Sequence, residues 1–325
     1  METQRRKAAV AWLSVLSNTT LVLGKLVVGL LIGSVSVISE AIHSGVDWLA
    51  AVIALFAVKT SHKAADEEHP FGHGKVENIS GTVEALLIFL AAGWIIYEAS
   101  HKLLHPQPVE APGWGVGVML VSSVVNIIVS QMLFRVGRET DSVALQADAW
   151  HLRTDVYTSA GVMAGLTLLL AGQRFFPGTN LLWVDPVAAI AVALLIVHTA
   201  WKLVLESGRD LLDASLPAEE TAWIREHLKG FSPPVRGFHH LRTRKAGSVR
   251  FIEFHLAVEQ DLSVGESHRF SDTITHGIKA RFPRALVTIH VEPCDGECRP
   301  ACEAGCLLTR EEMTADHLRR AVVSS

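Results

Sequence analysis

Two pairs of histidine and aspartate stand in segments that are otherwise mostly apolar. His43 and Asp47 form one pair, and His151 and Asp155 form the other. A spacing of four residues places both members of a pair on one face of a helix. Two imidazoles and two carboxylates suit tetrahedral Zn²⁺, with ligand distances of about 2.0–2.2 Å. One divalent cation would neutralise the two aspartates, and an empty site of this kind is expected to bind protons instead.

The depth of these residues supports a shared site. At about 1.5 Å of rise per residue, His43 and Asp47 lie about 12 and 18 Å below the outer end of their helix. His151 and Asp155 lie about 17 and 10 Å below the same surface of a bilayer core about 30 Å thick. The two pairs overlap near mid-membrane, which predicts one metal site. Two unrelated polar pairs at helix contacts are the alternative.

Other polar residues in the apolar segments give weaker signals. Glu40 and Asp148 each precede a histidine of the pairs by three residues. Each could hold that imidazole through a second hydrogen bond, and a packing contact is the alternative. The remaining polar residues are predicted to join helices or to reach toward the interface: Asn18, Lys25, Glu84 and Asn126.

The segments that carry these residues have the length of membrane-spanning helices. The chain has 325 residues, 49% of them hydrophobic and 19% charged, with a net charge of −4. This composition excludes disorder, and the charge does not favour nucleic acid as a partner. About 20 apolar residues span a bilayer. The first of six such runs is too long in its apolar part for a cleavable signal peptide. The six runs are Ala8–Ile32, Val35–Val58, Ile79–Ser100, Trp114–Phe134, Ser142–Leu170 and Leu181–Leu205.

The positive charges of the short loops predict the orientation of these spans. One side holds eight basic residues: Arg5, Arg6, Lys7, Lys59, Lys63, Lys75, Arg135 and Arg138. The other side holds two, Lys102 and Arg174. Because basic residues accumulate on the cytoplasmic side, both termini are expected in the cytoplasm.

From about Gly208 the composition becomes that of a soluble domain. We predict helices at Ala218–Leu228 and His268–Phe282. We predict strands at Phe238–Arg244, Val249–Val258 and Ala285–Glu292, with a hairpin loop at 245–248. The α-β-β-α-β order favours a small ferredoxin-like α+β domain. The expected division is an all-α six-helix transmembrane domain at 1–207, a cytoplasmic metal-binding and dimerisation domain at 208–293, and a tail at 294–325.

Three motifs stand out in the sequence: SEAIHSGVD at 39–47, HPFGHGK at 69–75, and ADAWH at 147–151 with Asp155 following. Together they resemble the cation diffusion facilitator family of divalent-metal/proton antiporters. The resemblance implies a homodimer in a bacterial inner membrane that alternates between inward- and outward-facing states and exports metal with the proton gradient. It implies that the two His/Asp pairs form the transport site. Histidine at position 43 resembles the zinc-transporting members most.

The resemblance also implies two further metal sites. Asp66, His69 and His73 match ligand positions in a loop that is rich in acidic residues and imidazole, and a solvated turn is the alternative there. The second implied metal site lies in the cytoplasmic domain, where ordinary surface histidines are the alternative to metal ligands. Strand alternation predicts His239 on one face of its strand and His240 on the other. Five residues there align with dimer-interface metal ligands: His239, His255, His268, His290 and Glu292.

A charge pair and a group of cysteines complete the predictions. Lys75 and Asp213 resemble an interlocking charge pair at the dimer hinge of the family. The tail carries Cys294, Cys298, Cys302 and Cys306 at a regular spacing of four. A four-thiolate zinc site and free thiols are both consistent with that spacing. Disulfides are not expected in a reducing compartment.

These observations predict a secondary active transporter without an organic cofactor rather than an enzyme. Its cargo would be Zn²⁺ or another divalent transition metal such as Cd²⁺, Co²⁺ or Fe²⁺. Because metal ligands must lose their protons, metal binding would release H⁺ and couple the two fluxes. A metal-sensing membrane protein and an intramembrane zinc hydrolase are the alternatives. The hydrolase would need an H-E-x-x-H helix, which the sequence lacks.

Overall fold

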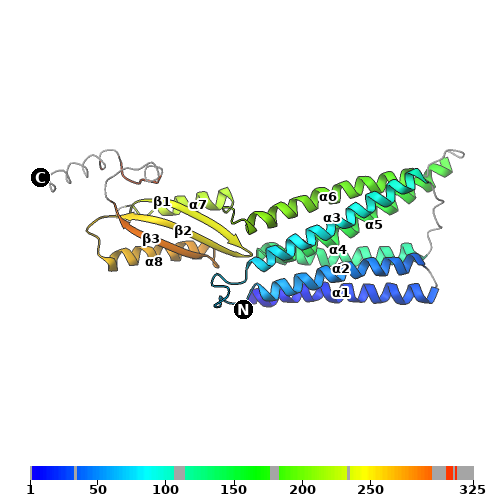
Figure 1. Cartoon of the computed structure of the whole chain (residues 1–325), viewed down its shortest axis with the longest axis horizontal. Helices are drawn as coiled ribbons and strands as arrows, with labels where there is room; N and C mark the ends of the chain where they lie inside the picture. The colour runs from blue at the N-terminus through cyan, green and yellow to red at the C-terminus, as the bar shows by residue number, and fades with distance from the viewer. Residues whose placement is uncertain are drawn as a thin grey trace. The chain divides into compact units, whose positions relative to one another are not determined.

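The chain folds into two compact units, Met1–Leu211 and Leu212–Ser325. The computed structural model describes residues 2–32, 35–105, 114–175, 183–232, 235–294, 305–309 and 312. Among the described residues, the first unit contains six long helices, and the second contains two helices and a small sheet (Figure 1). Each unit has its own hydrophobic core.

The helices of the first unit extend beyond the predicted apolar runs. Their bounds are α1 Glu2–Ile32, α2 Val35–Thr60, α3 Lys75–Leu104, α4 Trp114–Glu139, α5 Val143–Phe175 and α6 Val184–Leu211. The predicted ends at Ala8, Ile79 and Phe134 are therefore wrong by several residues. Bilayer thickness limits the apolar stretch but not the helix, which continues wherever its backbone hydrogen bonds continue. The predicted start of the last span, Leu181, lies outside the described residues.

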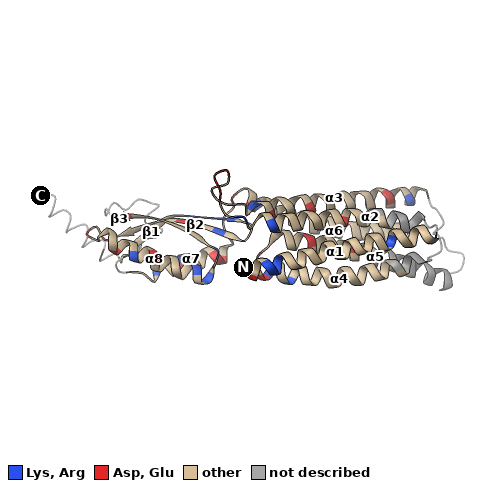
Figure 2. Ribbon diagram, turned by 90° about the horizontal axis from the view of Figure 1, so that it is seen from below, with Lys and Arg blue, Asp and Glu red and all other residues tan. Residues whose placement is uncertain are grey.

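Four helical segments of the described chain are long and apolar enough to cross a membrane. They are Glu2–Leu31, Lys75–Leu104, Met119–Glu139 and Pro186–Leu211. Among the described residues, neither α2 nor α5 yields such a segment, so four of the six predicted spans have this support. Figure 2 shows charged residues gathered at the end of the bundle that holds the N-terminus, with few along its length.

The helices pack around two cores that share α5. One core joins α1, α2, α4 and α5 through residues such as Val15, Leu55, Leu133 and Leu152. The other joins α3 and α6 to α5 through Ile88, Ile196 and Ala147. The outer surface carries many exposed apolar side chains, among them Leu16, Leu90 and Trp94, at 63%, 71% and 68% exposure. A surface of this kind is suited to lipid and unsuited to water.

The second unit has the predicted α-β-β-α-β order. Its elements are α7 Ala218–Lys229, β1 Val235–Ala246, β2 Val249–Val258, α8 Val264–Arg281 and β3 Leu286–Pro293. The sheet has the order β1-β2-β3, antiparallel between β1 and β2 and parallel between β2 and β3. It therefore has three strands, where a full ferredoxin-like unit has four. Both helices share one core with the sheet.

Two local predictions in this unit need correction. The hairpin turn has two residues rather than four, because Ala246 pairs with Val249 and Gly247 takes a φ of +57°. Two-residue hairpin turns require such a positive φ, which glycine tolerates. Helix α8 begins at Val264 rather than His268. Ser263 and Glu266 form a capping box there, a signal that was readable in the sequence.

Candidate metal sites

A buried cluster of carboxylates and imidazole joins α2 to α5. Asp47 comes from α2, and His151 and Asp155 come from α5. One ligand atom from each of the three lies within 4.8 Å of the others. His151 Nε2 is 3.1 Å from Asp47 Oδ1, and the two residues are only 4% and 5% exposed. The structure thus brings together three of the four residues predicted for the transport site.

The fourth predicted residue, His43, lies on α2 one turn before Asp47, but its side chain is outside the described part of the structure. The side chain of Glu40 is outside it as well. Asn126 on α4 was predicted only to join helices or to reach toward the interface, and not to lie near the metal site. Asn126 Nδ2 donates to Asp155 Oδ2 at 3.4 Å, which adds a neighbour to the cluster.

The hydrogen bonds around His151 bear on the two alternatives for Asp148. His151 Nδ1 is buried and has no hydrogen-bond partner among the described residues. The bond to Asp148, one of the two alternatives that the sequence left open, is therefore absent from this part of the structure, although Asp148 is fully buried on the same helix. Glu84 on α3 is also fully buried and accepts a hydrogen bond of 2.9 Å from Ser80. The predicted interhelical contact of Lys25 is confirmed, because its Nζ donates to Ser44 Oγ at 2.7 Å.

The loop between α2 and α3 folds its predicted ligands around one carboxylate. Asp66 Oδ1 accepts from the backbone N–H of His69 at 2.7 Å, and Asp66 Oδ2 is 3.4 Å from His73 Nε2. Gly72, with a φ of +80°, turns the chain between the two histidines, whose ring centroids are 4.4 Å apart. The hydrogen bond from the His69 backbone and the charge of His73 lower the pKa of Asp66. The loop therefore presents an ionised carboxylate and the exposed imidazole of His69, whereas the imidazole of His73 is only 10% exposed.

A third cluster lies on the sheet of the second unit. The strand register places His239, His255 and His290 at adjacent positions of β1, β2 and β3. Glu292 reaches all three, with its carboxylate 2.9 Å from His239 Nε2, 3.2 Å from His255 Nδ1 and 3.9 Å from His290 Nε2. His268 is not in this cluster and lies on α8, 3.5 Å from Asp272.

The predicted alternation of β1 is wrong at His240. An irregularity in the register follows His239, and His240 has a φ of +51°. The ring centroid of His240 consequently lies 5.0 Å from those of both His239 and His255. A bulge of this kind turns a side chain toward the face opposite to the one that simple alternation predicts. A pocket of about 270 Å³ opens beside His240, His255 and His290.

The remaining predicted residues are only partly described. Cys298 and Cys302 lie outside the described residues. Cys294 N–H donates to Val258 O, and Cys306 pairs with Gly237 of β1 in an isolated bridge. Lys75 Nζ donates to the carbonyl of Leu211 at 3.3 Å, within the first unit. Asp213 belongs to the second unit, where Arg244 contacts it at 3.4 Å, so its pairing with Lys75 stays a prediction.

Comparison with known proteins agrees with these features. Residues 11–212 match the family model of the cation efflux transmembrane domain, and residues 216–294 match that of the cation efflux protein cytoplasmic domain. An uncharacterised transporter of Synechocystis sp. is 35% identical over 263 residues, covering 81% of this chain and 83% of that protein. The cation-efflux pump FieF of Yersinia pestis is 34% identical over 262 residues, covering 81% and 84%.

Two solved structures that match each cover about a quarter of this chain. CzrB in its Zn form is 41% identical over 26% of this chain and 96% of that chain, with a TM-score of 0.25. The metal-bound C-terminal domain of the CzcD transporter of Thermotoga maritima is 28% identical over 24% and 94%, with a TM-score of 0.22.

The family models together cover most of the chain, which therefore belongs to the cation efflux, or cation diffusion facilitator, family. Members of this family are membrane-embedded transporters of metal cations and not enzymes.

Proposed function

We propose that this protein exports a divalent transition metal, with Zn²⁺ foremost, from the cytoplasm in exchange for protons. The observation that carries the proposal is the buried cluster of Asp47, His151 and Asp155 between α2 and α5. Ionisable residues inside a membrane are costly by about 2.5–3.5 kcal/mol each, so such a cluster marks a function. The match to a transmembrane cation efflux domain identifies that function as cation transport.

The chemistry of the ligands supports zinc and proton coupling. We include His43 as the fourth ligand, so that two imidazoles and two carboxylates hold the ion. Imidazole favours Zn²⁺, Co²⁺ and Cd²⁺, whereas a set made of carboxylates alone favours harder ions. Two aspartates in a low-dielectric site keep a compensating charge, either a metal ion or protons. Loading with metal then expels protons, and protonation releases the metal.

The proposal includes six membrane spans and an orientation. We assign α2 and α5 as spans because both pack in the core of the helical unit and carry the proposed transport site. The basic residues at the N-terminus and at the end of α4 favour a cytoplasmic location for both termini. The bacterial relatives are consistent with the inner membrane. The second unit would then be a cytoplasmic domain and the segment after residue 293 a tail.

Reconstituted vesicles test the transport proposal. With a pH gradient imposed, the full-length protein should move Zn²⁺ and counter-transport protons. The variant Asp155→Asn keeps the side-chain shape, removes a negative ligand and should abolish flux. Glu98→Gln is the matched control, because Glu98 lies on α3 and its ion pair within the described residues is a 3.9 Å contact to Lys102. This variant should transport normally. Intact zinc binding without flux in the wild type would instead favour a metal sensor.

We further propose that the chain forms a homodimer and that metal at the sheet cluster regulates transport. His239, His255, His290 and Glu292 would bind the ion, and His268 would complete the site across the dimer interface. Metal there would draw the cytoplasmic domains of two protomers together. In the triple alanine variant of the three clustered histidines, metal stoichiometry should fall and activation by cytoplasmic zinc should be lost. Unchanged stoichiometry and transport would refute the regulatory role.

Two smaller elements belong to the same proposal. Asp66, His69 and His73 would bind zinc weakly at the cytoplasmic mouth, where the ionised Asp66 attracts cations. Lys75 and Asp213 would pair at the dimer hinge. A charge-reversed double variant, Lys75→Asp with Asp213→Lys, should restore any transport lost in either single variant, and no restoration would argue against the pair.

A further inference from the structure

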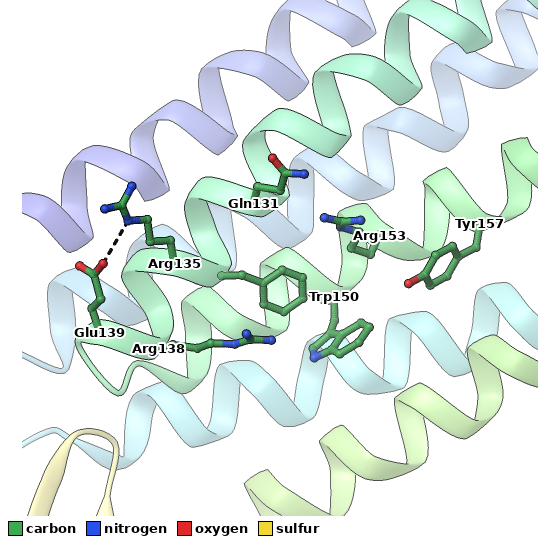
Figure 3. Close-up of a pocket in the computed structure, with 8 residues that line it drawn as sticks. Gln131, Arg135, Arg138, Glu139, Trp150, Arg153 and Tyr157 are labelled. Carbon is green, nitrogen blue, oxygen red and sulfur yellow. Dashed lines mark hydrogen bonds and ion pairs between the residues drawn. The ribbon is translucent and has the colours of Figure 1, made fainter.

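A pocket of about 600 Å³ lies on the side of the bundle formed by the end of α4 and the first half of α5. Figure 3 shows its walls. Three arginines and three aromatic residues dominate them: Arg135, Arg138, Arg153, Phe134, Trp150 and Tyr157. The single acidic residue of the lining, Glu139, contacts Arg6 at 2.6 Å and Arg135 at 3.1 Å. Its charge is therefore shared between those two arginines.

The other two arginines keep an uncompensated charge. In the part of the chain that the structure describes, neither Arg138 nor Arg153 forms an ion pair, and Arg153 Nε is buried without an acceptor. Arg138 lies over the ring of Phe134, with 5.3 Å between the guanidinium carbon and the ring centroid. Guanidinium groups on an aromatic wall are suited to a bidentate contact with phosphate oxygens.

The surroundings of the pocket indicate an amphipathic ligand. Arg153 is ten residues into α5, about 15 Å from the start of that helix. The face of α4 that holds Gln131 and Arg135 continues at helical spacing to Ile128 and Val124, which are 54% and 55% exposed. A molecule with its anionic head among the arginines could thus lay apolar chains along α4. An anion dissolved in water would gain nothing from that apolar face.

We propose that this pocket binds the headgroup of an anionic phospholipid of the inner leaflet. Basic pockets between membrane helices on the cytoplasmic side are suited to such headgroups, and the cytoplasmic leaflet carries the negative lipids. The site is separate from the proposed transport cluster, although Trp150 and Arg153 flank His151 on α5. A bound lipid would therefore contact α5, the helix that carries two of the proposed transport ligands.

Native mass spectrometry of the full-length protein in detergent tests the site. Phosphatidylglycerol should remain bound where phosphatidylcholine does not. Arg138→Gln and Arg153→Gln should each weaken retention by about fivefold, the factor expected for one basic residue at a lipid headgroup. Arg5→Gln is the matched control. Arg5 is an exposed arginine in the first turn of α1 and is not among the residues that line the pocket, so its loss should change retention little.

Three results would overturn the proposal. Equal retention in the wild type and in both pocket variants would mean that the pocket holds no lipid. An equal loss in Arg5→Gln would mean that only the general charge of this end attracts lipid. Displacement of phosphatidylglycerol by inorganic phosphate at similar concentration would mean that the ligand is a soluble anion. If Arg153→Gln does not fold, the exposed Arg138 carries the same comparison alone.

Discussion

Buried polar residues of the helical unit fall into two groups that differ in how completely the protein satisfies them. Glu77 belongs to the satisfied group. Its two oxygens accept from Lys7 at 2.7 Å, from Ser61 at 2.8 Å and from Ser142 at 2.6 Å. His151 belongs to the other group, because its Nδ1 has no partner in the described part of the chain. An unsatisfied buried nitrogen costs about 1–3 kcal/mol, and binding of a metal ion at this position would offset that cost.

The identity of residue 43 should control which metal is transported. His43→Asp would leave one imidazole among three carboxylates, and that set favours harder ions. We expect the ratio of Zn²⁺ to Mn²⁺ transport to fall in proteoliposomes that contain both metals. His101→Asp, in the last turn of α3, is the control and should keep the wild-type ratio. An unchanged ratio in His43→Asp would remove residue 43 from the selectivity site.

The buried pair of Lys7 and Glu77 gives a second prediction at the residue scale. Both side chains are 1% exposed, so removing one leaves an uncompensated charge. Lys7→Met should destabilise the protein by about 3–5 kcal/mol, as expected for breaking a buried ion pair. Adding Glu77→Gln to Lys7→Met should recover part of that loss in thermal unfolding in detergent. A double variant less stable than the sum of the single changes would contradict the pairing.

At the scale of elements, close approach of helices depends on glycines that face a neighbour. A Cβ at Gly81 of α3 would lie 2.7 Å from Ser207 Oγ of α6 and 3.0 Å from a methyl of Val143. Gly161 of α5 faces Val192 of α6 in the same manner, with 2.6 Å to a methyl carbon. Small residues at such contacts allow backbones to approach and strengthen packing within a membrane. These contacts fix α5, and with it the proposed site.

Two glycines of the same helix test this point. Gly81→Ala should destabilise the protein by about 1–3 kcal/mol, the usual cost of overpacking. Gly93→Ala is the matched control, because nothing lies within 4 Å of the added carbon. It should be neutral or stabilising by up to about 1 kcal/mol, since alanine has the higher helix propensity. If Gly81→Ala and Gly93→Ala had equal effects in thermal unfolding, the contact between α3 and α6 would accommodate the added carbon at little cost.

At the scale of the whole molecule, the described residues form two clusters of metal-ligating residues in the first unit and one in the second. We expect Zn²⁺ to stabilise both units, by about 2.7 kcal/mol at a concentration one hundred times the dissociation constant. Calorimetry of the full-length protein should resolve the units. Asp155→Asn should lower the zinc-dependent shift of the helical unit alone, with the weak loop site of Asp66, His69 and His73 keeping the remainder. Glu292→Gln should remove the shift of the second unit alone. Loss of both shifts in either variant would contradict independent sites.

Much of this architecture was accessible from residue patterns. The apolar runs predicted the long helices because bilayer thickness demands such lengths. The change of composition near Gly208 lies within four residues of the boundary between the two compact units. The order of elements in the second unit followed from periodicity, and the i, i+4 spacing of His151 and Asp155 placed both on one face of α5.

The tertiary structure decided what depends on distant partners. Strand register, which sets His255 between His239 and His290, follows from packing and cannot be read from one strand. The bulge at His240 reverses the face that alternation predicts. The pairing of Lys7 with Glu77, 70 residues apart, and the arginine pocket between α4 and α5 depend on which helices become neighbours. Local spacing thus determines which groups share a face, whereas long-range packing determines what each face meets.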